Sequence, residues 1–122
     1  MQNTTLDMWT WIDYDIWRDT DISGFGVQAV DGDIGSVDEA TYDTGASYVV
    51  VDTGPWIFGK KVLLPAGVID QVDVTNRKLF VNRTKDEIQK APEFDPERYQ
   101  EEAYRNNLGI YYGERMPAGT RR

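Results

Sequence analysis

Short apolar runs separated by turn residues fill the central part of this chain. Tyr48–Asp52 and Phe58–Leu64 are rich in valine, leucine and aromatic residues, and the turn-forming pair Gly54-Pro55 lies between them. Apolar runs of about four to eight residues, closed by glycine or proline, are typical of buried strands. The same pattern predicts further strands at Val27–Val30, at Ile34–Val37 with a continuation through Ala40 and Tyr42, at Val68–Val72 and at Leu79–Val81.

The residues between these runs predict where the strands turn. Asp31-Gly32 is a two-residue hairpin signal, because both positions tolerate a positive φ. Gly35, inside the next run, indicates a bulge or a tight barrel corner, and Thr75-Asn76-Arg77 predicts a later turn. About six short strands joined in this way predict a mainly β fold, a small antiparallel β-barrel formed as a meander.

Two short helices are predicted after the last strand. Thr84-Lys-Asp-Glu87 is a capping box, so a helix of one or two turns should begin there and end before Pro92. A second helix should begin at Asp95-Pro96, with the aspartate as N-cap and the proline in the first helical position. It is expected to run to about Asn107 and to stop at Gly109.

These elements divide the chain into three parts. An aromatic and acidic N-terminal arm is expected at residues 1–22, the barrel at residues 23–92, and a C-terminal helix with its tail at residues 93–122. The apolar stripe of the last helix is thin, so we expect this helix to dock weakly.

The N-terminal arm holds three of the four tryptophans, Trp9, Trp11 and Trp17. Period-two alternation with β-favouring residues favours a strand or an extended arm, and a short helix capped by Thr4 is the competing interpretation. Both faces of the arm carry large apolar groups, so it should pack across the barrel or against a second subunit. The tryptophans are then either core residues or anchors of an arm that binds a partner.

A further pair of aromatic residues, Trp56 and Phe58, follows the Gly54-Pro55 turn. An aromatic side chain at a turn either covers the barrel or is exposed as an anchor for a partner. Trp9, Trp11, Trp17, Trp56 and Phe58 are therefore the candidate partner-binding residues.

Composition limits the class of partner. The chain has 122 residues, enough for one domain with a core, and its net charge of −8 repels nucleic acid and anionic membrane surfaces. No apolar stretch approaches the roughly 20 residues that span a bilayer, and the N-terminus lacks the pattern of a signal peptide. With no cysteine in the chain, we expect a cytoplasmic location without membrane insertion.

The residues for most catalytic and metal chemistry are missing from the sequence. There is no histidine, which removes imidazole ligands and histidine-based triads. The Asp31–Ser36 segment fails the EF-hand template, and no phosphate-binding loop is present. We therefore expect no metal, no cofactor and no enzymatic activity. Paired carboxylates such as Asp13 with Asp15 keep open the alternative of a small ligand-binding or metal-binding protein, or of an enzyme that uses clustered carboxylates.

A family resemblance rests on motifs in order and spacing. The motifs are Asp31-Gly32-x-Ile34-Gly35-x-Val37, Tyr48-Val-Val-Val-Asp52 and Gly59-x-x-Val62-x-Leu64-Pro65. Together they resemble the PRC-barrel family, which includes the cytoplasmic domain of the photosynthetic reaction centre H subunit and a domain of a bacterial ribosome maturation factor. The ending Asn82-Arg-Thr84-Lys85-x-x-Ile88-x-x-Ala91-Pro92 is more similar to the reaction-centre branch.

The resemblance implies a compact, soluble, stand-alone β-barrel that docks on other proteins and carries no catalytic residues. We therefore expect a non-enzymatic interaction module that assembles with itself as a homo-oligomer or with a protein partner. A ribosome or RNA assembly factor follows only from the other family branch, and the acidity of the chain argues against it.

Overall fold

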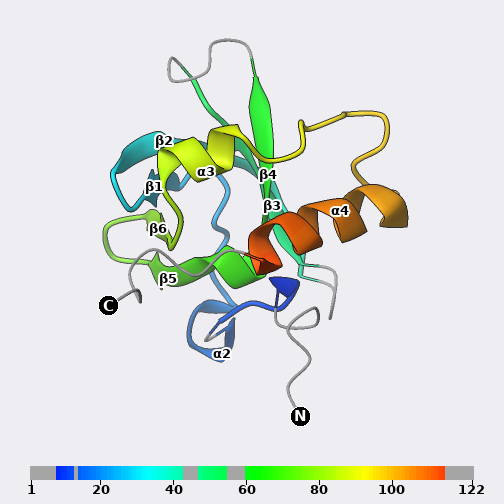
Figure 1. Ribbon diagram of the computed structural model, residues 1–122. Helices are drawn as coiled ribbons and strands as arrows, with labels where there is room; N and C mark the ends of the chain where they lie inside the picture. The colour runs from blue at the N-terminus through cyan, green and yellow to red at the C-terminus, as the bar shows by residue number, and fades with distance from the viewer. Residues whose placement is uncertain (1–7, 13, 43–46, 55–59, 115–122) are drawn as a thin grey trace.

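The computed structural model describes residues 8–12, 14–42, 47–54 and 60–114. Figure 1 shows a curved sheet whose strands surround the core, with helices packed around it. The strands are β1 (Gly26–Ala29), β2 (Gly32–Ala40), β3 (Tyr48–Asp52), β4 (Lys61–Pro65), β5 (Ile69–Asp73) and β6 (Lys78–Val81). The helices are α2 (Tyr14–Trp17), α3 (Lys85–Gln89) and α4 (Glu102–Gly113), and the 3₁₀ turn η1 (Ala66–Val68) joins β4 to β5. The prediction of a mainly β fold of six strands is confirmed.

The strands form one sheet in the order β4-β3-β2-β1-β6-β5. All neighbours are antiparallel except β1 and β6, which are parallel, so the predicted all-antiparallel pairing is corrected at this one pair. Because β5 is antiparallel to β6, it runs in the same sense as β4. The chain therefore turns a corner at η1 instead of reversing in a hairpin, and in the described residues no ladder joins the edge strands β4 and β5.

The first hairpin is present, but its turn lies one residue earlier than predicted. Ala29 pairs with Gly32, so Val30 and Asp31 form the two-residue loop. Asp31 then accepts a hydrogen bond from the backbone N–H of Lys85 (2.9 Å), which ties this loop to the start of α3.

Gly35 lies at the irregularity that the sequence predicts in this strand. The β1–β2 register shifts between Val27 and Gln28, which pair with Gly35 and Asp33. Gly35 has φ +142°, and a Cβ there would lie 2.0 Å from the carbonyl oxygen of Asp52. Only glycine therefore allows β2 to approach the end of β3 this closely.

The helices α3 and α4 differ in how well local sequence predicts them. The capping box of α3 is confirmed, because Thr84 and Glu87 each accept a hydrogen bond from the other's backbone N–H. Asp95 caps only a turn, and α4 begins later than predicted, at Glu102. Within that turn the ring of Tyr99 packs on Tyr48 with centroids 6.1 Å apart. Tertiary contact thus holds residues 95–101 out of the helix.

Gly109 lies inside α4 and does not end it, which corrects the predicted stop. A Cβ at this position would lie 2.9 Å from Nε1 of Trp9, so the missing side chain makes room for the indole. Leu108 and Tyr112, on the same side of the helix, are fully buried. The helix therefore docks through its second half, which lies beyond the predicted end at about Asn107 and outside the thin apolar stripe that the sequence indicated.

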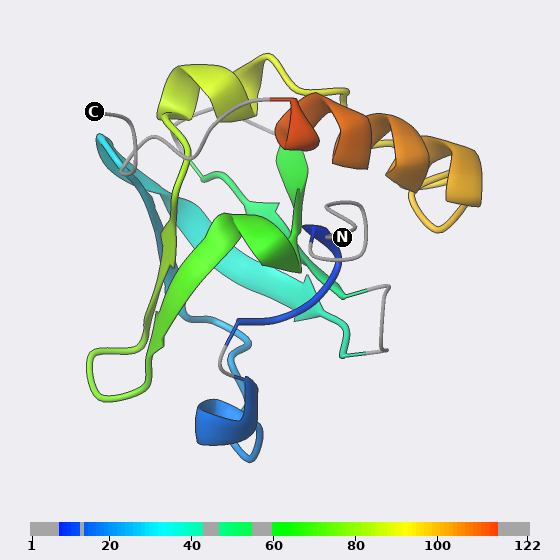
Figure 2. The same cartoon turned by 60° about the horizontal axis from the view of Figure 1, so that its bottom comes forward.

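The N-terminal arm is folded onto the core. Figure 2 shows α2 at one end of the sheet, with α3 and α4 at the other. No strand is present in the described part of the arm, so its helical interpretation is the closer one, although α2 begins at Tyr14 and Thr4 lies outside the described residues. Trp9, Trp11 and Trp17 are all buried in the single core cluster.

Replacing Gly35 with alanine should lower the free energy of unfolding by about 2 to 4 kcal/mol, because the new Cβ pushes β2 away from β3. Gly54→Ala is the matched control. Gly54 also has a positive φ, +55°, but a Cβ there meets nothing within 4 Å, so the loss should stay near 1 kcal/mol. Urea denaturation followed by tryptophan fluorescence measures the free energy of unfolding of both variants. Equal losses in the two variants would contradict the close approach of β2 to the end of β3.

Replacing Gly109 with alanine should destabilise the protein by about 1 to 3 kcal/mol, because the Cβ displaces the buried Trp9 indole. Inside an ordinary helix the same change stabilises by about 1 kcal/mol. Gly113→Ala, at the open end of α4 where a Cβ meets nothing within 4 Å, should be neutral or stabilising. Thermal unfolding of the two variants tests the Trp9 contact. The melting temperature of Gly109→Ala should fall below that of Gly113→Ala.

Candidate functional site

Four aromatic side chains form a cluster where the N-terminal arm meets the end of β2. Trp17 lies edge-on to both Trp11 and Tyr14, with ring centroids 4.9 Å apart in each pair. Tyr42 stacks on Tyr14 at 5.6 Å and on Trp11 at 6.0 Å. Each such pair contributes about 0.5 to 1.5 kcal/mol beyond its buried area, so the cluster is a rigid unit.

Hydrogen bonds fix the arm in this position. The indole N–H of Trp11 donates to the carbonyl of Thr41 (2.9 Å), and the backbone N–H of Ser47 donates to the carbonyl of Trp9 (3.0 Å). The indole N–H of Trp17 donates to the carbonyl of Ile12 (3.4 Å). The indole N–H groups of Trp11 and Trp17 thus find acceptors, which offsets the penalty for burying them.

The outer residues of this region remain accessible. Tyr42 is 40 % exposed, Ile12 is 39 % exposed and Tyr14 is half-buried. Burial, and after it the nearby carboxylate of Asp21, raises the pKa of the Tyr42 hydroxyl above its ordinary value. Tyr42 therefore stays neutral at physiological pH. We call Ile12, Tyr14 and Tyr42 the aromatic patch.

The five residues singled out in the sequence fall into two groups. Trp9, Trp11 and Trp17 are each less than a tenth exposed, so within one chain they support the surface and do not form it. Trp56 and Phe58 lie outside the described residues, and their role as anchors stays a prediction. The sequence reasoning missed Tyr42, whose only signal was its place at the end of a predicted strand.

A second surface feature is a groove beside the edge strand β4. One hollow of about 160 Å³ lies between β4 and the segment that joins α3 to α4. An adjoining hollow of about 380 Å³ shares with it Lys60, Lys61, Glu93 and Phe94. We call the two hollows together the β4 groove. Its inner part is lined by Leu63, Ile88, Ala91, Pro92 and Tyr112 and also by the polar residues Lys60, Lys61, Gln89 and Glu93.

Two lysines that line the β4 groove form exposed ion pairs, one with Glu93, which also lines the groove, and one with Asp38 of β2, which does not. Lys60 lies 2.7 Å from Glu93, and Lys61 lies 2.8 Å from Asp38. The hydrogen bond to Asp38 raises the pKa of the Lys61 ammonium, and the hydrogen bond from Lys60 lowers the pKa of the Glu93 carboxyl. All four side chains are more than two-fifths exposed, so solvent screens both ion pairs and they are weak.

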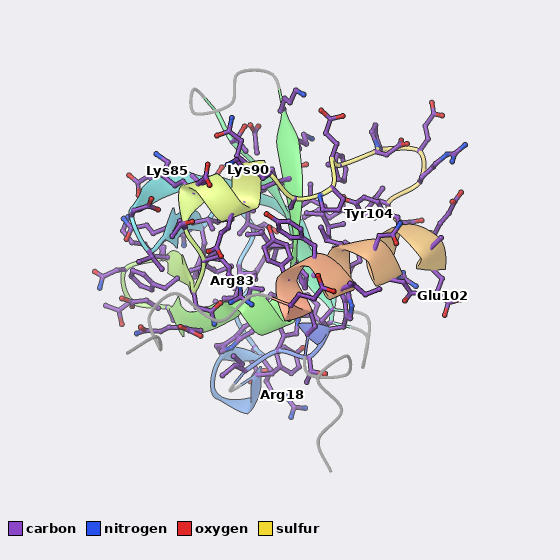
Figure 3. All side chains as sticks on the ribbon, in the orientation of Figure 1. Arg18, Arg83, Lys85, Lys90, Glu102 and Tyr104 are labelled. Carbon is purple, nitrogen blue, oxygen red and sulfur yellow. The ribbon has the colours of Figure 1, made fainter. Side chains whose placement is uncertain are left out.

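The inner wall of the groove is held by buried contacts from α4. Figure 3 shows Arg83 beside the C-terminal end of α4, where its guanidinium donates to the carbonyl of Tyr112 (2.9 Å). Arg83 also donates to the side chain of Asn82 and lies 5.7 Å from the Tyr112 ring centroid. The hydroxyl of Tyr104 lies 3.4 Å from the carbonyl of Pro92, and burial raises its pKa to about 12. These contacts make the wall a fixed surface.

The described residues hold neither a metal-binding cluster nor a membrane-spanning helix. In the ranges that the structure describes, no group of three or more histidine, cysteine, aspartate or glutamate side chains could hold a metal ion. Within those ranges no helix is both long and apolar enough to cross a membrane. The aromatic patch and the β4 groove are therefore the two candidate sites on the described surface.

Comparisons with known proteins identify the family. None of the curated proteins matches the chain. The family model of the PRC-barrel domain matches residues 15–88, from α2 through β1–β6 to α3. This span covers more than half of the sequence and contains every strand of the sheet, so the chain belongs to the PRC-barrel domain family.

Proposed function

We propose that this protein is a non-enzymatic interaction module that assembles with a second copy of itself or docks on another protein. PRC-barrel domains are generally non-catalytic and serve in contacts between proteins, and the match covers the whole sheet. A chain of net charge −8 is a poor ligand for nucleic acid, so a protein is the favoured partner. Within the family we place the chain nearer to the reaction-centre branch, on the residues that follow β6.

The observation that carries this proposal is the exposed edge of the aromatic cluster. Tyr42 and Ile12 are about two-fifths exposed, and Tyr42 stacks on Trp11, which is buried in the core. Aromatic anchors on a rigid support are typical of interface hot spots, because they bury a large area with little loss of side-chain entropy. The arm at residues 1–22 would then act by presenting this patch, while its tryptophans remain in the core.

The first experiment measures whether the protein associates through the patch. Ile12→Ser with Tyr42→Ser should weaken self-association, or binding to a partner captured from its own cells, by at least about tenfold, which is about 1.4 kcal/mol. Size-exclusion chromatography with light scattering, over a range of protein concentrations, measures self-association. Quantitative pull-down with the wild-type protein and the double variant measures binding to the partner.

The matched control is a pair of exposed apolar residues away from the patch. Val30, in the loop between β1 and β2, is 53 % exposed, and Val74, after β5, is 42 % exposed. Val30→Ser with Val74→Ser removes similar apolar area and should leave association unchanged. If the patch variant, shown to be folded by circular dichroism, associates as well as the wild type, the patch is not the contact surface.

The alternatives from the sequence predict different results. A ligand-binding protein or a carboxylate enzyme should gain thermal stability from a metal ion or a common metabolite, and a ribosome assembly factor should co-sediment with ribosomes. No feature of the described residues favours ligand binding, carboxylate catalysis or ribosome assembly over protein docking.

A further inference from the structure

An exposed carboxylate lies beside the aromatic patch. Asp21 follows α2 along the chain, and its side chain is open to solvent. After burial, its charge is the next largest cause of the raised pKa of the Tyr42 hydroxyl, so the two groups are near neighbours. Hydrogen bonds from Ser23, among them one of 2.9 Å from its backbone N–H, lower the pKa of Asp21. Asp21 is therefore negatively charged at physiological pH.

The charge of Asp21 is not taken up by an ion pair. None of the salt bridges in the described part of the chain includes this carboxylate. The guanidinium of Arg77 lies over the ring of Phe25, 5.1 Å from its centroid, and has the smallest effect on the pKa of Asp21. A cation from another chain can therefore approach Asp21 without displacing a salt bridge.

The charge of the segment around the patch argues against a second copy as the partner. Residues 13–21 contain four aspartates and one arginine, and the whole chain has a net charge of −8. A symmetric contact through the patch would bring two such segments together, and like charges across an interface disfavour association. Charge complementarity therefore favours a basic segment of a different protein.

The size of the patch favours a short segment over a broad folded surface. A stable interface between two folded proteins buries about 800 Å² on each of them. Ile12 and Tyr42 are about two-fifths exposed and Tyr14 is half-buried, so the three side chains together offer much less area. A few side chains of one partner segment are enough to cover them.

Arginine is the basic residue that suits both features of this site. Its planar guanidinium can pair with a carboxylate through two parallel hydrogen bonds and has further N–H groups for a hydroxyl oxygen. Its methylene stem packs on apolar and aromatic surface while the charged end stays in water. Lysine is a point charge without this fixed geometry. The Asp21 carboxylate and the Tyr42 hydroxyl are thus suited to one guanidinium.

We infer that the aromatic patch binds a short segment of a different protein, in which apolar side chains cover Ile12 and Tyr14 and an arginine pairs with Asp21. The guanidinium also donates a hydrogen bond to the hydroxyl oxygen of Tyr42. The apolar contacts supply affinity, and the arginine selects the partner and speeds its encounter with an acidic protein. This inference rests on the proposed docking function and names the chemistry of the partner at the same patch.

The test titrates the full-length, ¹⁵N-labelled protein with short peptide probes. The first probe is an acetylated and amidated octapeptide in which serine and glycine separate two leucines and two arginines. The second probe has citrulline in place of each arginine, which keeps the shape of the side chain and removes its charge. The arginine peptide should shift the amide signals of Ile12, Tyr14, Asp21 and Tyr42. The citrulline peptide should bind at least about tenfold more weakly.

A third probe separates arginine from positive charge in general. It carries lysine in place of each arginine and has the same net charge as the first peptide. It should bind at least about threefold more weakly than the arginine peptide, because an ammonium group cannot pair with Asp21 through two parallel hydrogen bonds. Equal binding of the lysine and arginine peptides would overturn the assignment of arginine.

Two protein variants locate the contact. Asp21→Asn should remove the difference between the arginine and citrulline peptides, because asparagine can still accept the hydrogen bond from Ser23 but carries no charge. Asp33→Asn is the matched control. Asp33 is also exposed, but it lies near the start of β2, whereas Tyr42 follows the end of that strand. This control should leave the difference between the peptides unchanged.

Several outcomes would overturn the inference. They are the absence of shifts with the arginine peptide, equal binding of the arginine and citrulline peptides, and an unchanged difference in Asp21→Asn. Undiminished binding of the arginine peptide to the Ile12→Ser with Tyr42→Ser variant would place the contact elsewhere and also reject it.

Failure of this inference and failure of the proposed function give different results. If the wild type self-associates and the Ile12→Ser with Tyr42→Ser variant does not, the partner is a second copy, so the inference is wrong while the proposed function stands. If that variant loses the arginine peptide but still associates with its cellular partner as well as the wild type, the patch binds arginine and the proposed docking function of the patch is wrong.

Discussion

The structure depends on how the gap between its two edge strands is covered. In the described residues β4 and β5 belong to one sheet, yet no hydrogen bonds join them, so the core between them must be closed by side chains. Leu108 and Tyr112 of α4 do this and are fully buried. The buried guanidinium of Arg83 fixes α4, because it donates to a carbonyl in the last turn, where the helix dipole favours a cation. Burial raises the pKa of the Tyr112 hydroxyl, which stays neutral in this setting.

A small barrel also explains why so many aromatic residues precede it. Short strands enclose little volume, and the N-terminal arm adds three buried indoles to the same core. Trp9 connects the arm to two distant parts of the fold, since its ring packs on Tyr48 and lies against Gly109. Removing the arm would therefore expose the core as well as any contact surface. Substitutions at the surface of the cluster separate these two effects, and a truncation cannot.

The parts of the fold that local sequence determines could be predicted. Short apolar runs bounded by turn residues located all six strands, and the capping box at Thr84 located α3. The parallel pairing of β1 with β6 could not be predicted, because it follows from the corner at η1, and an apolar run carries no sign of its direction. The start of α4 and the role of Gly109 depend on Tyr48 and Trp9, which are distant in sequence.

The candidate site was only partly predictable, because it too depends on contacts between residues that are distant in sequence. Tryptophan content correctly indicated the region of the aromatic cluster but not which side chains lie outermost, since exposure depends on the way the arm folds. Tyr42 is exposed because Trp11 and Trp17 fill the space beneath it. The β4 groove could not be predicted from the sequence, because its walls come from three separate segments: β4, α3 and the segment before α4.

An unpaired strand edge is a hazard, because it can pair with any exposed strand and cause aggregation. In β4 the hazard is limited by Pro65, which has no N–H to donate, and by the packing that leaves Leu63 only 3 % exposed and Leu64 fully buried. The part of this strand that is open to solvent is its start at Lys61, where a charged side chain disfavours pairing with another strand.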